Sequence, residues 1–257
     1  MSTGAAAAAA TARAVSSLGA SFMSDPAMSA RGRELGFDGI DFYLVGRAGV
    51  VGEVDSNVAT AALVFFHPDV VLAAWNRSAG VMSRREAAAA FASCAWDWAD
   101  NHLGNDLGND LDNDLDSDIG NDLDWDTLLV LTRRIVDAAD AALAPLFAGW
   151  RTLPEPDGVR RQTVHLMNAL REFRMARHAA ALVTHCVPIG DAVRHRQPTM
   201  TAMFGWDPGE VADDVVARWE TADAMTDTIV GQVYDTLDAD QLDQFVALAH
   251  AAVATIH

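Results

Sequence analysis

The chain has 257 residues, 51% of them hydrophobic, and a formal net charge of −18. That much apolar material can form a buried core in one large domain or two small ones. No run of about 18 apolar residues is present, which excludes a membrane span and a membrane partner. The alanine-rich start, residues 1–10, has neither the basic nor the strongly apolar region of a secretory signal.

The cysteine content indicates a reducing compartment. Only Cys94 and Cys186 are present, and a secreted chain of this size often carries more. We therefore expect free thiols and a cytoplasmic protein. All 18 basic residues are arginine.

The negative charge is concentrated in one segment. Residues 97–126 hold eleven aspartates, and without them 25 acidic residues face 18 arginines, a balance of −7. Nucleic-acid binding depends largely on neutralising phosphates, so it would need a local basic face. No such face is evident in the sequence, which makes nucleic acid an improbable partner.

Helix signals begin early in the chain. Asp25 followed by Pro26 predicts a helix that runs to Leu35, with Gly36 as its C-terminal stop. The next segment, 37–51, is apolar enough for a strand or a buried helix. We interpret it as a helix, because an isolated strand would have no partner.

Capping residues predict three more helices in the first half of the chain. Asp55 caps a helix over 56–66, and His67-Pro68 ends it and starts another that reaches Trp75. Ser83 begins a helix that runs through Trp98.

The second half is predicted to contain four helices. Asp126 begins a long helix to about Phe147, and a second long helix covers about 158–185. Asp207-Pro208 begins a third. Asp238, with Gln241 three residues later, forms a capping box for a last helix that reaches Ile256.

Between these halves lies a four-residue repeat of Gly, Asn, Asp and Leu, Gly104 to Asp124. Its oxygen ligands suit calcium, but the nine-residue period and paired glycines of calcium-binding repeats are absent. A solvated low-complexity insert is the favoured interpretation. The expected organisation is an N-terminal helical region, 1–101, the insert, 102–125, and a C-terminal helical region, 126–257.

Several blocks of sequence resemble one family of actinobacterial proteins. They are Gly46–Asp55, Val58–Pro68, Ala74-Trp75, Leu170–Arg174, Arg177–Leu182, Phe204–Trp206, Glu220, Thr226-Asp227, Tyr234 and Leu237. The chain is similar in these blocks to the SalK family, whose members are labelled helix-turn-helix proteins. The resemblance covers most of the chain outside the insert and implies no particular biochemical activity.

The resemblance implies an all-helical fold whose C-terminal half is like a winged helix-turn-helix. Family members continue from the Gly-Trp helix into a short wing, but here 208–218 runs almost directly into Trp219. The predicted class is therefore all-α, a helical bundle with a C-terminal half that resembles a degenerate, wingless winged helix-turn-helix. The final helix, 240–256, would close the core or form a homodimer.

DNA binding is disfavoured by the helix that would enter a major groove, about Pro208 to Trp219. It carries Glu210, Asp213 and Asp214 against a single Arg218. A recognition helix needs Arg, Lys, Asn or Gln to reach base edges.

The long helix over 158–185 carries the best candidate for a ligand-facing surface. Arg171, Arg174, His178 and His185 fall within roughly 60° of one another on a helical wheel, whereas Glu172 lies with His165 on another face. Two arginines and two histidines suit a carboxylate or phosphate. The plainer interpretation, which we favour, is an internal polar network in which Glu172 neutralises an arginine.

Other motifs point to no chemistry. No His-Glu-x-x-His arrangement or other metal-ligand spacing occurs, so no metal site is predicted. Gly46, Gly49 and Gly52 lack the rest of a phosphate loop and more simply allow close helix approach, although Arg47 between them could face a pocket. No Ser-His-Asp or Cys-His set is recognisable, so no catalytic residue is assigned.

The preferred hypothesis is a non-enzymatic, small-molecule-binding or regulatory accessory protein of the SalK type. Its candidate ligand residues lie between the N-terminal helices and the long helix: Arg47, Arg171, Glu172, Arg174 and His178. The sequence identifies no cofactor. One alternative is a DNA-binding transcription regulator, and another is an enzyme of secondary metabolism that uses His178 beside Arg174 as acid or base.

Overall fold

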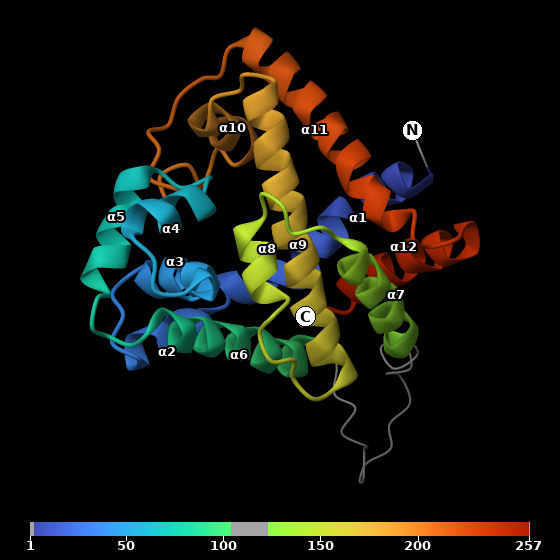
Figure 1. The fold of residues 1–257 in the computed structure, drawn as a ribbon, viewed down its shortest axis with the longest axis horizontal. Helices are drawn as coiled ribbons and strands as arrows, with labels where there is room; N and C mark the ends of the chain where they lie inside the picture. Colours follow the sequence, from blue (N-terminus) through green and yellow to red (C-terminus); the bar gives the residue numbers. More distant parts are fainter. Residues whose placement is uncertain (1–2, 104–122, 257) are drawn as a thin grey trace.

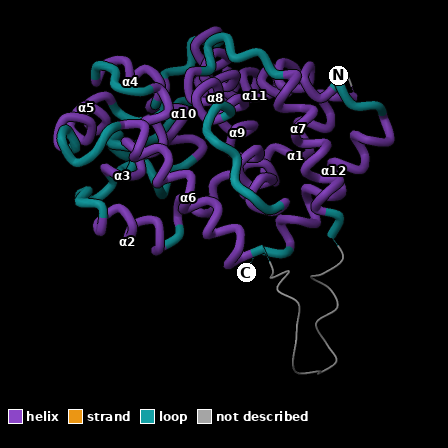
Figure 2. Tube along the Cα trace, turned by 60° about the horizontal axis from the view of Figure 1, so that its bottom comes forward, coloured by secondary structure: helices purple, strands orange, loops and turns teal. Residues whose placement is uncertain are grey.

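The computed structural model describes residues 3–103 and 123–256 (Figure 1). Every regular element in this part of the chain is helical, as the colouring of Figure 2 makes plain. The predicted all-α class is therefore confirmed. Most of the expected insert, 102–125, lies outside the described residues.

One long helix, α9 (Val159–Thr184), runs through the middle of the molecule (Figure 1). Five other helices pack against it: α1 (Thr3–Ala20), α6 (Arg84–His102), α7 (Trp125–Ala138), α8 (Pro145–Trp150) and α11 (Asp213–Tyr234). The two halves of the sequence therefore share the main core around α9, which is the long helix predicted over 158–185. A smaller buried cluster lies where the C-terminal end of α9 meets α10 and α11.

The alanine-rich start of the chain is the core helix α1, which no sequence signal had predicted as a helix. It packs against α9, α11 and α12 (Ala239–Ala254). Its small side chains allow this closeness: a Cβ atom built on Gly4 would collide with the backbone carbonyl of Gly231 in α11, and one on Gly231 would collide with the backbone of Ala5. The crossing of α1 and α11 therefore depends on glycine in both helices.

The remaining N-terminal elements are short helices around α6. They are the 3-10 turns η1 (Ser21–Ser24) and η2 (Gly49–Val51), and the helices α2 (Pro26–Glu34), α3 (Asp41–Ala48), α4 (Ser56–Ala62) and α5 (Pro68–Arg77). The segment 37–51 thus contains helix, as expected. The predicted caps are present too: Asp25 and Asp55 accept backbone N–H groups, and Ser83 forms a capping box with Glu86.

Three predicted helix spans were wrong. The helix expected from Asp126 to Phe147 is divided into α7 and α8, because the chain leaves helical geometry at Ala139 and Pro145 restarts it. The helix expected to end at Phe66 stops at Ala62. The backbone leaves helical geometry at the next residue, Leu63, which has a ψ of 44°.

The helix expected at Asp207-Pro208 begins instead at Asp213, after an extended Ala212. The connection before it is held by side chains from elsewhere: Arg194 donates through Nε to the Asp207 carbonyl at 2.7 Å. Between α10 (Ile189–Arg196) and α11 the chain forms no strand. The predicted absence of a wing thus holds for 197–212.

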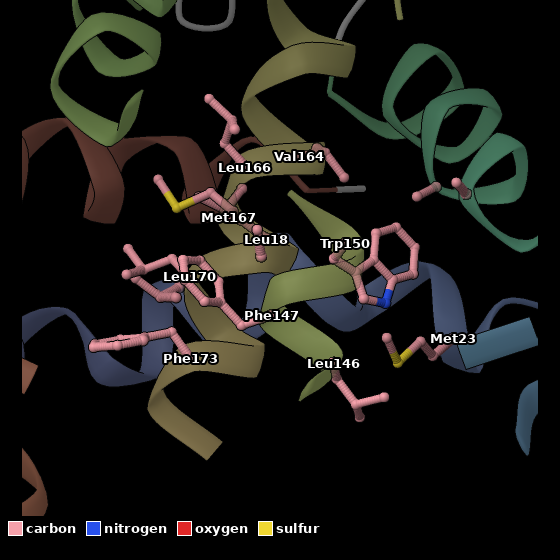
Figure 3. Close-up of a cluster of buried hydrophobic side chains, with 14 of the residues drawn as sticks. Leu18, Met23, Leu146, Phe147, Trp150, Val164, Leu166, Met167, Leu170 and Phe173 are labelled. Atoms are coloured by element: carbon pink, nitrogen blue, oxygen red, sulfur yellow. The ribbon is translucent and has the colours of Figure 1, made fainter. Parts of the chain in front are cut away.

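Part of the core lies where α8 meets α9, α1 and η1 (Figure 3). The rings of Phe147 and Phe173 pack edge to face at 5.3 Å, and Leu18 of α1 and Met23 of η1 belong to the same cluster. Fully burying side chains of this size contributes about 1.5–3 kcal/mol each. This packing fixes α9, and with it the arginines on the other faces of the helix.

The apolar face of α12 closes the core against α1 and α7. Leu242, Phe245, Ala249 and Ala252 are buried there. The exposed side of the helix carries Asp243, Gln244 and His250. A homodimer through this helix stays a prediction, and it would have to use the polar side.

Candidate functional site

A cavity of about 420 Å³ lies beside the C-terminal half of α9, enclosed by α1, α3, α10 and α11. Figure 1 shows α10 and α11 on either side of this end of α9. Arginines from four helices line the cavity: Arg13, Arg47, Arg171, Arg174 and Arg196. Among its lining residues in the described part of the chain, Asp223 is the only carboxylate.

Arg47 and Glu172 form a buried ion pair at the floor of the cavity. Arg47 donates through Nε and Nη2 to the two carboxylate oxygens, at 2.7 and 2.9 Å, and the side chains are only 5% and 1% exposed. Arg171 donates to the same carboxylate at 2.7 Å. Burial favours the neutral acid, but the charges of Arg47 and Arg171 outweigh it, so the pKa of Glu172 lies below its ordinary value.

Arg174 is only partly satisfied by protein groups. Its Nη2 lies 2.7 Å from an oxygen of Asp227 and 3.8 Å from one of Asp223. Its Nη1 is buried and makes no hydrogen bond within residues 3–103 and 123–256. A buried guanidinium donor without an acceptor is uncommon and costly.

His178 is held in one tautomer. The hydroxyl of Thr226 donates to the Ala222 carbonyl at 2.8 Å, so it can only accept from Nδ1 of His178, 3.0 Å away. Nδ1 therefore carries the proton, and Nε2 keeps a lone pair. Burial lowers the pKa of His178, with Asp223 opposing that effect, and the empty site holds a neutral imidazole at pH 7.

Aromatic rings complete the wall of the cavity. The His178 ring stacks on Phe65 with centroids 6.1 Å apart and meets the edge of Trp219 at 5.8 Å. Tyr43 and Phe204 line the same space. The cavity thus combines cationic groups with flat apolar surfaces, which suits an acid that carries an aromatic or aliphatic body.

The Phe204-Gly205-Trp206 turn fixes Phe65 in place. Trp206 donates through Nε1 to the Phe65 carbonyl at 2.8 Å, and the backbone N–H of His67 donates to the Phe204 carbonyl at 2.8 Å. Gly205 has a φ of +82°, and a Cβ there would also collide with a side chain of α5. These contacts join the two sequence blocks on which the family resemblance most depends.

The structure brings all five predicted ligand residues together. Arg47, Arg171, Arg174 and His178 line the cavity, and Glu172 lies behind it, where it neutralises arginines as the plainer interpretation required. His185, which shares the helical stripe, does not line the cavity. The polar network around Glu172 is thus confirmed, and a ligand-facing surface on this helix stays a prediction.

Sequence reasoning missed Arg13, Arg196, Tyr43, Trp219 and Asp223. Only Arg13 left a signal, because it is the one charged side chain in residues 1–24. A lone arginine on an alanine-rich helix has to reach solvent, an acid or a cavity. The other four come from helices whose approach to α9 has no local signature.

The basic residues of α10 are not displayed as a nucleic-acid face. Arg194 donates to Asp191 and to the Asp207 carbonyl, His195 packs on Trp219, and Arg196 lines the cavity. Helix α11 opens with two aspartates, and its Arg218 pairs with one of them at 3.1 Å. These two helices therefore offer no row of cations to phosphates.

Other kinds of site are not formed by the described residues. No group of three or more His, Cys, Asp or Glu side chains in 3–103 and 123–256 lies close enough to hold a metal ion. Burial raises the pKa of Cys94 to about 11, so this thiol is protonated and unreactive at neutral pH. No helix in the same part of the chain is long and apolar enough to cross a membrane.

Comparison with known proteins identifies one relationship. The sequence model of a helix-turn-helix family matches residues 8–217, from within α1 to the start of α11. No curated protein and no solved structure matches the chain. Because the match covers well over half of the chain, the chain belongs to this helix-turn-helix family.

Proposed function

We propose that the chain is a non-enzymatic regulatory or accessory protein of the SalK type that binds a small anionic molecule in the cavity beside α9. One observation carries the proposal. Five arginines line the cavity, although the chain as a whole has a formal charge of −18. A protein with twice as many acidic as basic residues has no general reason to gather its cations around one internal space.

The charges around the cavity do not cancel. Three carboxylates contact or face the five arginines: Glu172, Asp223 and Asp227. Two positive charges remain in this group. Arg47 is buried and Arg171 and Arg174 are half-buried, so salt screens these three weakly, whereas Arg13 and Arg196 are exposed. A carboxylate or phosphate would compensate them through charge-assisted hydrogen bonds with the arginines that line the cavity.

The alternatives rest on separate observations. A DNA-binding regulator is favoured by the family, but the basic side chains of α10 are engaged within the chain. An enzyme is favoured by the Nε2 lone pair of His178 beside Arg174, which suits a general base. Salt-sensitive DNA binding that Arg218→Ala weakens would support the first, and turnover abolished by His178→Ala in a folded protein would support the second.

The test compares ligand retention with binding of a known probe. Native and denatured masses of the purified protein reveal any retained molecule, and titration with 8-anilinonaphthalene-1-sulfonate, an anionic aromatic dye, gives an affinity. We expect Arg174→Ala to weaken probe binding by about tenfold or more, since a charged hydrogen bond contributes about 1.5–3 kcal/mol, and His178→Ala to weaken it less.

Arg218→Ala is the matched control, because it removes the same charge from an exposed position of α11 outside the cavity. It should leave the affinity unchanged. Retention of a demonstrably bound molecule by both Arg174→Ala and His178→Ala, at the wild-type level, would sink the proposal. Equal losses in all three variants would do so too, since they would indicate a general charge effect.

A further inference from the structure

A second cavity, of about 380 Å³, lies next to the arginine-lined one. It is formed by the end of α4, the start of α8 and the adjacent face of α9. Its walls are apolar: Leu143, Leu146, Ala176, Ala179, Ala180 and Val183. The charged residues that reach it are Arg47 and Glu172, which neutralise each other.

The two cavities share part of their wall. Arg47, Phe65 and Met175 line both of them. Met175 is unbranched and adaptable, so it can move aside, whereas Phe65 is half-buried and stacks on His178. A ligand that passes between these two side chains would reach from the arginines to the alanine-lined face.

That face of α9 is smooth because alanines recur at the spacing of one helical turn. Ala176, Ala179 and Ala180 present only Cβ atoms to the cavity, which leaves a channel of apolar surface. None of the three is fully buried. The protein thus leaves open a space that larger side chains would have filled in an ordinary core.

The outer end of the apolar cavity is exposed. Leu143 is 81% and Val183 65% exposed, and they are two of the most exposed large apolar side chains in the described part of the chain. Leu143 also has a positive φ of 56°, which is unfavourable for leucine. Both side chains border the cavity where an apolar chain would leave the protein.

We infer that one amphiphilic acid occupies both cavities, with its carboxylate or phosphate among Arg13, Arg171 and Arg174 and its apolar chain between Phe65 and Met175 against the alanines of α9. The inference rests on the anion site proposed above and names its ligand class. The combined volume, about 800 Å³, is in the usual range for a small-molecule site. The wall that the apolar cavity shares with the cationic one favours this occupant over a peptide or a second copy of the chain.

The test uses straight-chain carboxylates from butanoate to dodecanoate, with benzoate as a compact acid, titrated into the full chain. We expect the affinity to rise by about fourfold per methylene group and to level off when the chain reaches Val183. Alkyl phosphates of the same lengths distinguish a carboxylate from a phosphate head group. Dodecanol tests whether the head group matters.

Ala179→Leu should fill the channel. We expect it to remove most of the dependence of affinity on the length of the alkyl chain and to leave the affinity for benzoate unchanged. Arg174→Ala, in contrast, should weaken the binding of all the acids by a similar factor. Ala180→Val provides a milder block if Ala179→Leu fails to fold. Ala247→Leu, on the exposed side of α12, is the matched control and should behave as wild type.

The outcomes separate the two proposals. If benzoate and butanoate bind in an Arg174-dependent manner but longer chains bind no better, the two-cavity ligand is wrong and the anion site stands. If no acid binds, both fail. If dodecanol binds as tightly as dodecanoate, or if Ala179→Leu leaves the chain-length dependence intact, the apolar cavity is not the tail site.

Discussion

Arg47 and Glu172 lie 125 residues apart in the sequence and form two hydrogen bonds in the interior, at 2.7 and 2.9 Å. This pair joins α3, from the first half of the chain, to the central helix α9. It also stands between the two cavities, since Arg47 lines both. The contact therefore has a structural role and sets the position of a candidate ligand residue.

Removing one member of this pair should destabilise the fold strongly. Arg47→Met leaves the Glu172 carboxylate buried with Arg171 as its one remaining partner, and a broken buried pair costs about 3–5 kcal/mol. The double variant Arg47→Met with Glu172→Met removes both charges and should recover much of that loss. Urea unfolding of the wild type, Arg47→Met, Glu172→Met and the double variant gives the coupling energy between the two residues. Strictly additive losses would show that the pair does not act as a unit.

The approach of α1 to α11 gives a second prediction. Gly231→Ala places a methyl group against the backbone of Ala5, which cannot move without displacing α1. We expect a loss of at least about 1–3 kcal/mol in unfolding free energy, as for an overpacked core. Gly209→Ala is the control, because a Cβ there meets only the flexible side chain of Arg194 at ordinary contact distance. Thermal unfolding of both variants measures the difference.

Buried histidines should make the protein sensitive to mild acid. Burial lowers the pKa values of His165 and His178 below 6.5 in the folded state. A lowered pKa stabilises the fold above about 6.5, the pKa in the unfolded chain, and that stability is lost as the pH falls through the folded-state values. Urea midpoints measured from pH 7.5 to 5 should therefore fall.

The variant His165→Gln should flatten this pH profile, whatever its effect on stability at pH 7.5. His250→Gln, which alters an exposed histidine of α12, serves as the control. A profile that keeps its full slope in His165→Gln would mean that the acid sensitivity arises elsewhere.

Anion binding should strengthen as the pH falls. His178 is surrounded by Arg174 and Arg196, which disfavour its protonation, and by Asp223 and Asp227, which favour it. A bound anion adds negative charge beside the ring and raises the pKa of His178, so binding takes up a proton. The affinity for benzoate should then rise between pH 7.5 and 5.5, by at most about tenfold per pH unit for one coupled proton. His178→Gln should abolish the slope.

The sequence predicted those features whose causes are local. Asp25, Asp55, Ser83 and Asp238 cap helices where expected, because a cap needs only residues within one turn. The stripe of Arg171, Arg174 and His178 followed from helical periodicity alone. Its polar partners across the packed helices, Asp223 and Asp227, did not, because they depend on how α11 crosses α9.

The errors of the sequence analysis arise where contacts between distant segments, and not local residues, decide the structure. Asp207-Pro208 has the local chemistry of a helix start, yet residues 207–212 form no helix. Arg194 holds the Asp207 carbonyl there, and the neighbouring Trp206 donates to the Phe65 carbonyl. Arg13 was missed because α1 is held by the packing of its small residues against α9, α11 and α12. Contacts between distant segments decided each case.

The hydrogen bond between Trp206 and Phe65 supports a final prediction. Trp206→Phe keeps an aromatic ring but leaves the Phe65 carbonyl without its donor, which should cost about 1–3 kcal/mol of stability. Because Phe65 stacks on His178 and lines both cavities, the variant should also weaken binding of the anionic dye. Trp75→Phe is a matched control: it loses a similar bond, to the Val54 carbonyl at 3.0 Å, away from the cavities. Calorimetry should show similar losses of stability in the two variants. Dye titration should show a loss of affinity in Trp206→Phe alone. Equal affinities of the two variants for the dye would mean that Phe65 is positioned by its other contacts.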